Sequence, residues 1–249
     1  MSEFYVGYLP KAPAGIARRI RMAVGLLFAL AVIGALTFAC QQRTYAPAVF
    51  EYGKERNFEG GIEARPFPTL IVKRPNSPNS GSSRYLLVAE GKHGADREIA
   101  EFDGETVRLR GTLIYRGNQT MIELVSGSLS VTGQSDKASS VPKSLGTFDL
   151  SGEIVDGKCF LGVMNPGSGK VHRDCAALCL SGGIPPLFAT NDFRGAPAIL
   201  LLTNSNGQPL RKAAFLDRVG QPVRIKGTVL DKGDTLVFEA DPSTIAVLR

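Results

Sequence analysis

The pattern of apolar and polar residues changes sharply near residue 40. Residues Met22 to Ala39 form an apolar run without charge or proline. About 18 such residues are enough to cross a lipid bilayer as a helix. Further along, apolar residues alternate with charged ones, as around Val107 and Val223. This alternation is typical of strands with one buried face and one solvated face. The pattern therefore predicts one membrane-spanning helix followed by a mainly β region.

The charges beside the apolar run predict its orientation. Arg43 is the one basic residue that follows the run closely, whereas several precede it: Lys11, Arg18, Arg19 and Arg21. Such a bias places the N-terminus in the cytoplasm and the rest of the chain across the membrane. We therefore predict a bacterial inner-membrane protein with its N-terminus in the cytoplasm and the bulk of its chain in the periplasm.

A cleaved signal peptide is the alternative interpretation of the same run. The segment before Cys40 is a fair cleavage site, but the apolar run is long for a signal peptide. We favour a retained single-pass anchor. In either case most of the chain lies outside the cytoplasm, where disulfides persist and free thiols are unusual.

Two segments of the β region resemble each other. The segment that begins at Gly104 aligns with the segment that begins at Gly220. Upstream, Phe58–Ala64 aligns with Leu150–Asp156. The matched residues are Val107-Arg108 with Val223-Arg224, Gly111-Thr112 with Gly227-Thr228, Gly117 with Gly233, and Glu123 with Glu239. The sequence therefore predicts an internal repeat of one β-unit.

Each copy has the signals of a small barrel. Gly117 and Gly233 lie where hairpin turns need a positive φ. Residues 97–102 and 210–219 are predicted as single helices between strands. Five short strands with one helix indicate an OB-like barrel, with a β-sandwich as the alternative. The predicted organisation is a tail at 1–21, an anchor at 22–40, a first OB-like unit at 50–132, a linker at 133–144 and a second OB-like unit at 145–249.

The candidate chemistry lies in a short part of the second unit. Of the four cysteines and two histidines in the chain, three cysteines and one histidine fall between residues 159 and 179. They are Cys159, His172, Cys175 and Cys179. The first unit has no counterpart of the last three, which places them in an insertion. Because only one of two similar units carries them, a local role is favoured over a general folding role.

A helix predicted over residues 173–180 places Cys175 and Cys179 on one face, and His172 shares that face. Cys159 is predicted to reach this face from the end of a strand. Three thiolates and one imidazole suit a tetrahedral zinc site. The same soft ligands suit monovalent copper. Asp156 is a candidate to orient His172 through a hydrogen bond, although it also fits a simple turn.

A disulfide from Cys159 to either Cys175 or Cys179 is the competing prediction. Two cysteines four residues apart on one helix are poorly placed to bridge each other. The disulfide interpretation therefore leaves one thiol over, either buried, paired with a partner protein or reactive. Metal site, disulfide and reactive thiol remain open at this point.

Other activities find little support in the sequence. No CxxC pair, dinucleotide loop or Ser-His-Asp order stands out, and the segment Asn165–Lys170 lacks the Ser or Thr of a phosphate loop. The net charge of +6 comes partly from the cytoplasmic tail, and no basic stripe with interleaved aromatic residues occurs, so nucleic acid is not an expected partner. No enzyme activity is predicted, and copper or zinc are the cofactors to consider.

The second unit resembles a group of small secreted or membrane-attached bacterial domains without a known function. The resemblance covers about the last hundred residues and rests on these elements: Gly152, Ile154, Asp156, Cys159, His172, Cys175, Cys179, Gly182 and residues 223–229. It implies an OB-like barrel and carries no activity. Two functions follow as expectations. One is a non-catalytic accessory or assembly subunit of an envelope or respiratory membrane complex, with protein partners. The other is a metal-binding or thiol-exchanging protein.

Overall fold

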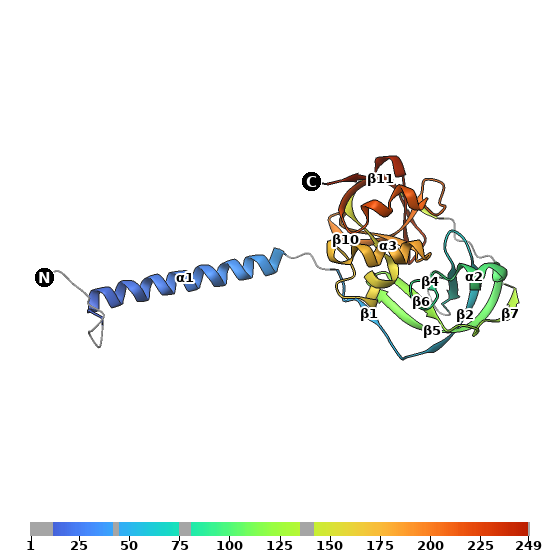
Figure 1. Cartoon of the computed structure of the whole chain (residues 1–249), viewed down its shortest axis with the longest axis horizontal. Helices are drawn as coiled ribbons and strands as arrows, with labels where there is room; N and C mark the ends of the chain where they lie inside the picture. Colours follow the sequence, from blue (N-terminus) through green and yellow to red (C-terminus); the bar gives the residue numbers. More distant parts are fainter. Residues whose placement is uncertain (1–11, 42–44, 75–80, 135–141, 249) are drawn as a thin grey trace. The chain divides into compact units, whose positions relative to one another are not determined.

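The computed structural model describes residues 12–41, 45–74, 81–134 and 142–248. Contacts divide the chain into two units, Met1–Thr44 and Tyr45–Arg249. The first contains one long helix and the second contains the β-structure (Figure 1). The chain is mainly β, as the hydrophobic pattern predicted.

Helix α1 spans Ala14–Gln41 and is long and apolar enough to cross a membrane. It begins earlier than the predicted span at residue 22, because the basic residues Arg18, Arg19 and Arg21 are part of the helix. Its apolar side chains, such as Leu27 and Phe28, are exposed. A helix that is apolar all round needs an apolar surrounding, which a bilayer supplies. That this helix is retained as a membrane anchor stays a prediction.

A five-stranded barrel follows α1 in the chain. The order β5-β2-β3-β4-β6 closes because β6 pairs with β5, and the β4–β6 pair is parallel whereas the others are antiparallel. A short helical segment, α2 (Asp96–Ile99) and η1 (Ala100–Phe102), connects β4 to β5. The strands are β2 (Arg56–Glu63), β3 (Thr69–Lys73), β4 (Ser82–Val88), β5 (Glu105–Arg116) and β6 (Gln119–Leu124), and β1 (Val49–Phe50) and β7 (Ser130–Gln134) also pair with β5.

The second barrel closes in the same way. The order is β11-β8-β9-β10-β12, β12 pairs with β11, and the β10–β12 pair is parallel. The strands are β8 (Lys143–Asp156), β9 (Pro186–Phe193), β10 (Ala196–Asn204), β11 (Pro222–Asp231) and β12 (Leu236–Ala240), with β13 (Ala246–Val247) on the edge of β11. A three-strand meander followed by a helical connection and two closing strands is the OB-like topology. The predicted fold class is confirmed.

The residues aligned in the sequence occupy equivalent register positions. Thr112 lies opposite Glu123 in the first barrel, and Thr228 lies opposite Glu239 in the second. Upstream, Gly60 lies opposite Val107, as Gly152 lies opposite Val223. The two sheets therefore share strand order and register, which is what two copies of one unit would show. The origin of this likeness by duplication stays a prediction.

One predicted helix is not continuous. Residues 210–219 form two separate turns of 3-10 helix, η4 (Lys212–Ala214) and η5 (Leu216–Arg218). Phe215 separates them with φ −143° and ψ −18°, and its side chain is 2% exposed. The ring therefore enters the barrel core at the cost of the helical backbone.

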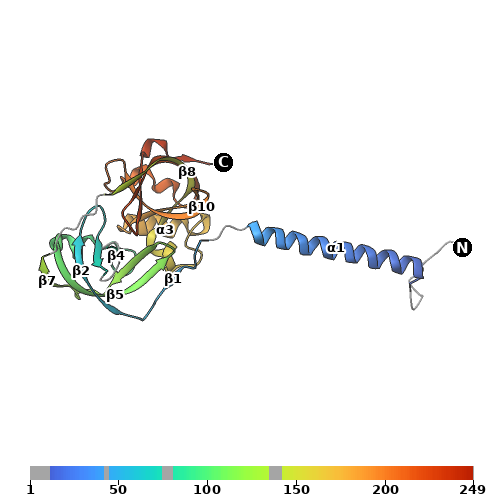
Figure 2. The ribbon, with the colours of Figure 1, turned by 180° about the vertical axis from the view of Figure 1, so that it is seen from behind.

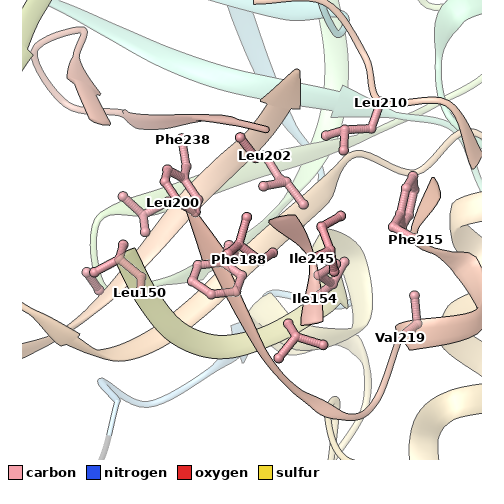
Figure 3. Packing of buried hydrophobic residues seen from close by; sticks show 14 of the residues in the cluster. Leu150, Ile154, Phe188, Leu200, Leu202, Leu210, Phe215, Val219, Phe238 and Ile245 are labelled. Atoms are coloured by element: carbon pink, nitrogen blue, oxygen red, sulfur yellow. The ribbon is translucent and has the colours of Figure 1, made fainter. Parts of the chain in front are cut away.

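The second barrel has its own apolar core. Phe188 and Phe238 are fully buried, and their ring centroids lie 5.4 Å apart. Figure 3 shows these rings beside Leu200 and Leu202. Two fully buried rings account for a large apolar area removed from water, which stabilises the barrel that carries the cysteine insertion.

A further apolar cluster joins the two barrels. Ile114 and Met121 of the first barrel pack in one cluster with Leu187 and Ile199 of the second. Strands reach into the predicted linker at both of its ends. Strand β7 ends at Gln134, β8 begins at Lys143, and residues 135–141 lie outside the described part of the chain. Tyr45–Arg249 is one compact unit in which both barrels share a core.

Two contacts pin the β4–α2 loop of the first barrel to the cysteine insertion. The backbone N–H of Gly94 donates to the carbonyl of Gly182 at 3.0 Å. A Cβ on Gly182 would lie 1.8 Å from the carbonyl oxygen of Lys92, so this close approach of two backbones requires glycine. Figure 2 shows helix α3 (Arg173–Ser181), which ends at Gly182, beside the two barrels from behind.

The second contact is a buried ammonium group. Lys158, just after β8, is 3% exposed and forms an ion pair with Glu123 of β6. Its Nζ also donates to the carbonyl oxygens of Ala89 and Gly91 at 2.9 and 2.7 Å. One lysine of the second barrel thus satisfies a carboxylate and two carbonyls of the first, which fixes the two barrels against each other.

We expect Lys158→Met to lower the free energy of unfolding by about 3 kcal/mol, because Glu123 and two carbonyls would lose a buried cationic partner. Urea denaturation of the reduced protein, followed by circular dichroism, measures this loss. Lys226→Met, which changes an exposed lysine on β11, is the matched control and should change stability by less than about 0.5 kcal/mol. Equal effects of the two substitutions would contradict the clamp.

Candidate functional site

The insertion between β8 and β9 carries the candidate site. After β8 the chain makes one π-helical turn, η2 (Cys159–Val163), then a loop and a 3-10 turn, η3 (Lys170–His172), before helix α3. Glu153 of β8 holds the loop, because its Oε1 accepts a hydrogen bond from the N–H of Gly169 at 2.6 Å. The pKa of Glu153 is raised, because the effect of burial is larger than that of this hydrogen bond, which lowers the pKa. The predicted helix over residues 173–180 matches α3.

Helix α3 presents its cysteines as the sequence predicted. Cys175 and Cys179 lie one turn apart, and Gly182-Gly183 end the helix with Gly183 at φ 98°. His172 is the residue before the helix, so it lies on the same turn as Cys175. Cys159 comes from another element, since it is the first residue of the η2 turn.

The four predicted ligands and Asp156 form two overlapping groups that share Cys159. The Sγ atoms of Cys159 and Cys175 and a ring nitrogen of His172 all lie within 4.8 Å of one another. The Sγ atoms of Cys159 and Cys179 and a carboxylate oxygen of Asp156 form a second such group. Cys159 belongs to both groups and is therefore the centre of the cluster. The structure brings these residues together, and the metal itself stays a prediction.

The carboxylate of Asp156 organises both sides of the cluster. Its Oδ1 accepts the N–H of Cys159 at 2.8 Å, and its Oδ2 lies 3.1 Å from Nε2 of His172. Asp156 has no exposed surface and His172 is 4% exposed. When a carboxylate accepts a hydrogen bond from a neutral imidazole ring through Nε2, the ring proton is on Nε2 and the Nδ1 lone pair is the one that can bind a metal.

The thiols are electrostatically unequal. A hydrogen bond with Cys179, together with burial, raises the pKa of Cys159 far above its ordinary value. The same hydrogen bond lowers the pKa of Cys179, because the sulfur that accepts a proton is stabilised as the thiolate.

A lysine from the first barrel completes the surroundings of the cluster. Nζ of Lys92, in the β4–α2 loop, donates to Sγ of Cys175 at 3.5 Å, and this hydrogen bond raises the pKa of Lys92. Local spacing in the sequence confined the predicted site to the second unit, and neither Lys92 nor Lys158 was among the predicted residues. The contact joins residues 92 and 175, which are far apart in the chain. Local spacing in the sequence carries no information about such a pair.

The predicted disulfide is not formed in the structure. Cys159, Cys175 and Cys179 are all free thiols, and so is Cys40 on the exposed surface of α1. The disulfide interpretation is therefore not confirmed, although the cysteines that it would join are close neighbours.

No family model, curated protein or solved structure matches the chain. The resemblance of the second barrel to small extracytoplasmic bacterial domains stays a prediction. The site has to be interpreted from its own geometry.

Asp156→Ala should destabilise the protein by at least about 2 kcal/mol, because the buried N–H of Cys159 and Nε2 of His172 would lose a charged acceptor. Asp149→Ala is a matched control on the same strand. Asp149 is exposed and faces Arg224 at 4.0 Å, and its loss should cost less than about 0.5 kcal/mol. Urea unfolding of both variants under reducing conditions measures the difference, and a loss as small for Asp156 as for Asp149 would refute its organising role.

Proposed function

We propose that this protein is a membrane-anchored, extracytoplasmic metal-binding protein. Its second barrel would hold one thiophilic ion, monovalent copper or zinc, through Cys159, His172, Cys175 and Cys179. The observation that carries the proposal is the convergence of three thiols and one imidazole in a largely buried cluster.

A metal accounts for more of the cluster than a disulfide does. A disulfide uses two thiols, leaves the third over, and gives no role to His172 and its carboxylate. Bound sulfurs lie about 2.3 Å from zinc, which puts two of them about 3.8 Å apart in a tetrahedron. The ligand atoms of Cys159, His172 and Cys175 already lie within 4.8 Å of one another, and the Sγ atom of Cys179 lies within the same distance of that of Cys159, so a modest rearrangement of Cys179 and a small contraction would reach that geometry.

The contact between Asp156 and His172 is the arrangement expected around a metal. Histidine ligands commonly donate their second N–H to a carboxylate, which fixes the ring and makes the other nitrogen a better ligand. Asp156 itself is better suited to this orienting role than to direct binding, because both its oxygens already have partners in Cys159 and His172. Soft sulfur ligands favour monovalent copper, whereas four protein ligands in a tetrahedron favour zinc.

Four protein ligands also favour a non-catalytic role. Catalytic zinc sites keep one coordination position open for water or substrate, whereas closed sites serve structure, storage or transfer. We propose that the chain is an accessory or assembly subunit of an envelope or respiratory membrane complex, held in place by α1. The excess of basic residues before the apolar span supports a periplasmic location for the two barrels.

Metal analysis tests the proposal directly. Full-length protein purified in detergent with a reductant should hold about one equivalent of copper or zinc. Cys175→Ser and His172→Ala should each weaken binding at least 100-fold, more than the loss of an orienting partner costs. Cys40→Ser removes a cysteine outside the cluster and should leave binding unchanged. Competition with a cuprous chelator and with a zinc chelator, in separate titrations, decides between the two metals.

Failure of the metal proposal has a clear signature. The protein would bind neither ion, and thiol counting with Cys40→Ser would find one free thiol instead of three. Such a result would leave the disulfide with a spare cysteine as the correct interpretation.

The anchor is tested by deletion and by a reporter. A chain that begins at Tyr45, the first residue of the compact β unit, should be recovered without detergent, whereas the full chain should require it.

An alkaline phosphatase fused after Arg249 should be active, because this enzyme folds only where disulfides form. An inactive fusion on a stably expressed chain would contradict the periplasmic orientation.

A further inference from the structure

The three thiols of the cluster differ in their access to solvent. Cys159 and Cys179 are 4% and 2% exposed, whereas Cys175 is partly exposed. Leu178, one turn after Cys175 on α3, is 59% exposed. Cys175 therefore lies at the edge between the buried face of α3, which carries His172 and Cys179, and its exposed face, which carries Leu178.

A positive charge faces the partly exposed thiol. Nζ of Lys92 lies 3.5 Å from Sγ of Cys175, and Lys92 is an exposed residue. Asp174 is the sequence neighbour of Cys175, but adjacent residues on a helix do not face each other. A ligand that approaches Cys175 from solvent therefore meets an ammonium group.

The structure holds the backbone around Lys92 in place on both sides of this residue. Lys158 donates to the carbonyls of Ala89 and Gly91, just before Lys92. Gly94, just after it, donates to Gly182 at the end of α3. The backbone around Lys92 is thus fixed to the cysteine insertion at both ends, which places this residue beside the site although it belongs to the other barrel.

We propose that Cys175 is the ligand through which the metal enters and leaves the cluster, and that Lys92 makes this exchange selective for anionic thiolate carriers. This inference rests on the proposed metal-binding function. The carriers are defined by their chemistry, as metal complexes of negatively charged thiols, either small molecules or the thiolate pair of a partner protein.

The exchange is a ligand substitution without electron transfer. The sulfur of Cys175 forms a bond to the carrier-bound metal, and one carrier sulfur–metal bond breaks. The proton of the Cys175 thiol passes to the departing thiolate, which leaves as a thiol. Cys159, Cys179 and His172 would then replace the remaining carrier thiolate, which takes the proton of one of these two thiols, while the proton of the other passes to solvent. Lys92 compensates the negative charge that accumulates while carrier and protein sulfurs share the metal.

Alkylation of the metal-free, reduced full-length protein tests the geometry without any metal. The reagents are iodoacetate, which is anionic, and iodoacetamide, which is neutral, with modified cysteines identified by mass spectrometry. Within the cluster, Cys175 should react at least tenfold faster than Cys159 and Cys179. Lys92→Ala should lower the ratio of iodoacetate to iodoacetamide rates at Cys175 about fivefold, the factor for unit charges about 4 Å apart in water.

Matched variants separate charge from structure. Lys92→Arg keeps the charge and should keep the ratio, and Lys54→Ala, which removes an exposed lysine of the same barrel, should leave it unchanged. Salt at 1 M should reduce the effect of Lys92→Ala on the ratio, because at this concentration the interaction between exposed charges is screened over a distance of about 3 Å. An unchanged ratio in Lys92→Ala, or faster alkylation of Cys159 or Cys179 than of Cys175, would overturn the inference.

A loading experiment extends the test to the metal. Cuprous ion supplied as its anionic glutathione complex should load Lys92→Ala about fivefold more slowly than the unchanged protein, at the same final stoichiometry. Cuprous ion supplied as its acetonitrile cation should load Lys92→Ala no more slowly than the unchanged protein, because an ammonium group repels a cation. Equal loading from glutathione would overturn the selectivity. Absence of loading from either source, with the alkylation ratio still dependent on Lys92, would instead refute the metal site.

Discussion

A carboxylate without any exposed surface stands where β8 gives way to the cysteine insertion, and most of the site depends on it. Burying the charge of Asp156 is costly unless hydrogen bonds compensate. The N–H of Cys159 and Nε2 of His172 provide that compensation. Since these donors lie at either end of the loop between the η2 turn and α3, satisfying one carboxylate fixes the start of that turn and the approach to α3 relative to each other.

This constraint acts within a core that neither barrel forms alone. Cys159 and Cys179 belong to the apolar cluster that includes Ile114 and Met121 of the first barrel. Interiors of this kind are closely packed, so the positions of the thiols follow from both barrels. The barrel without cysteines thus has a definite part in the site, as the wall against which the insertion packs.

The same arrangement explains why access to the cluster is one-sided. The insertion is covered by the barrels wherever it contributes to the shared core, and α3 leaves one face in solvent. Lys158 holds the β4–α2 loop at the edge of that face through the carbonyls of Ala89 and Gly91. A buried charge in the interface thereby determines where an exposed charge, that of Lys92, meets the cysteine cluster.

Local patterns in the sequence determined the parts of this protein that depend on near neighbours. These parts depend on residues that are close together in the chain. They are the apolar run, the alternation in β5 and β11, the hairpin glycines and the spacing of Cys175 and Cys179 on one helix. They predicted the fold class and four candidate ligands. The tertiary structure alone decided the burial of Asp156, the break at Phe215 and the contributions of Lys92 and Lys158. These depend on residues brought together from distant parts of the chain, where packing and the pairing of buried charges outweigh local preference, and no local period records such contacts.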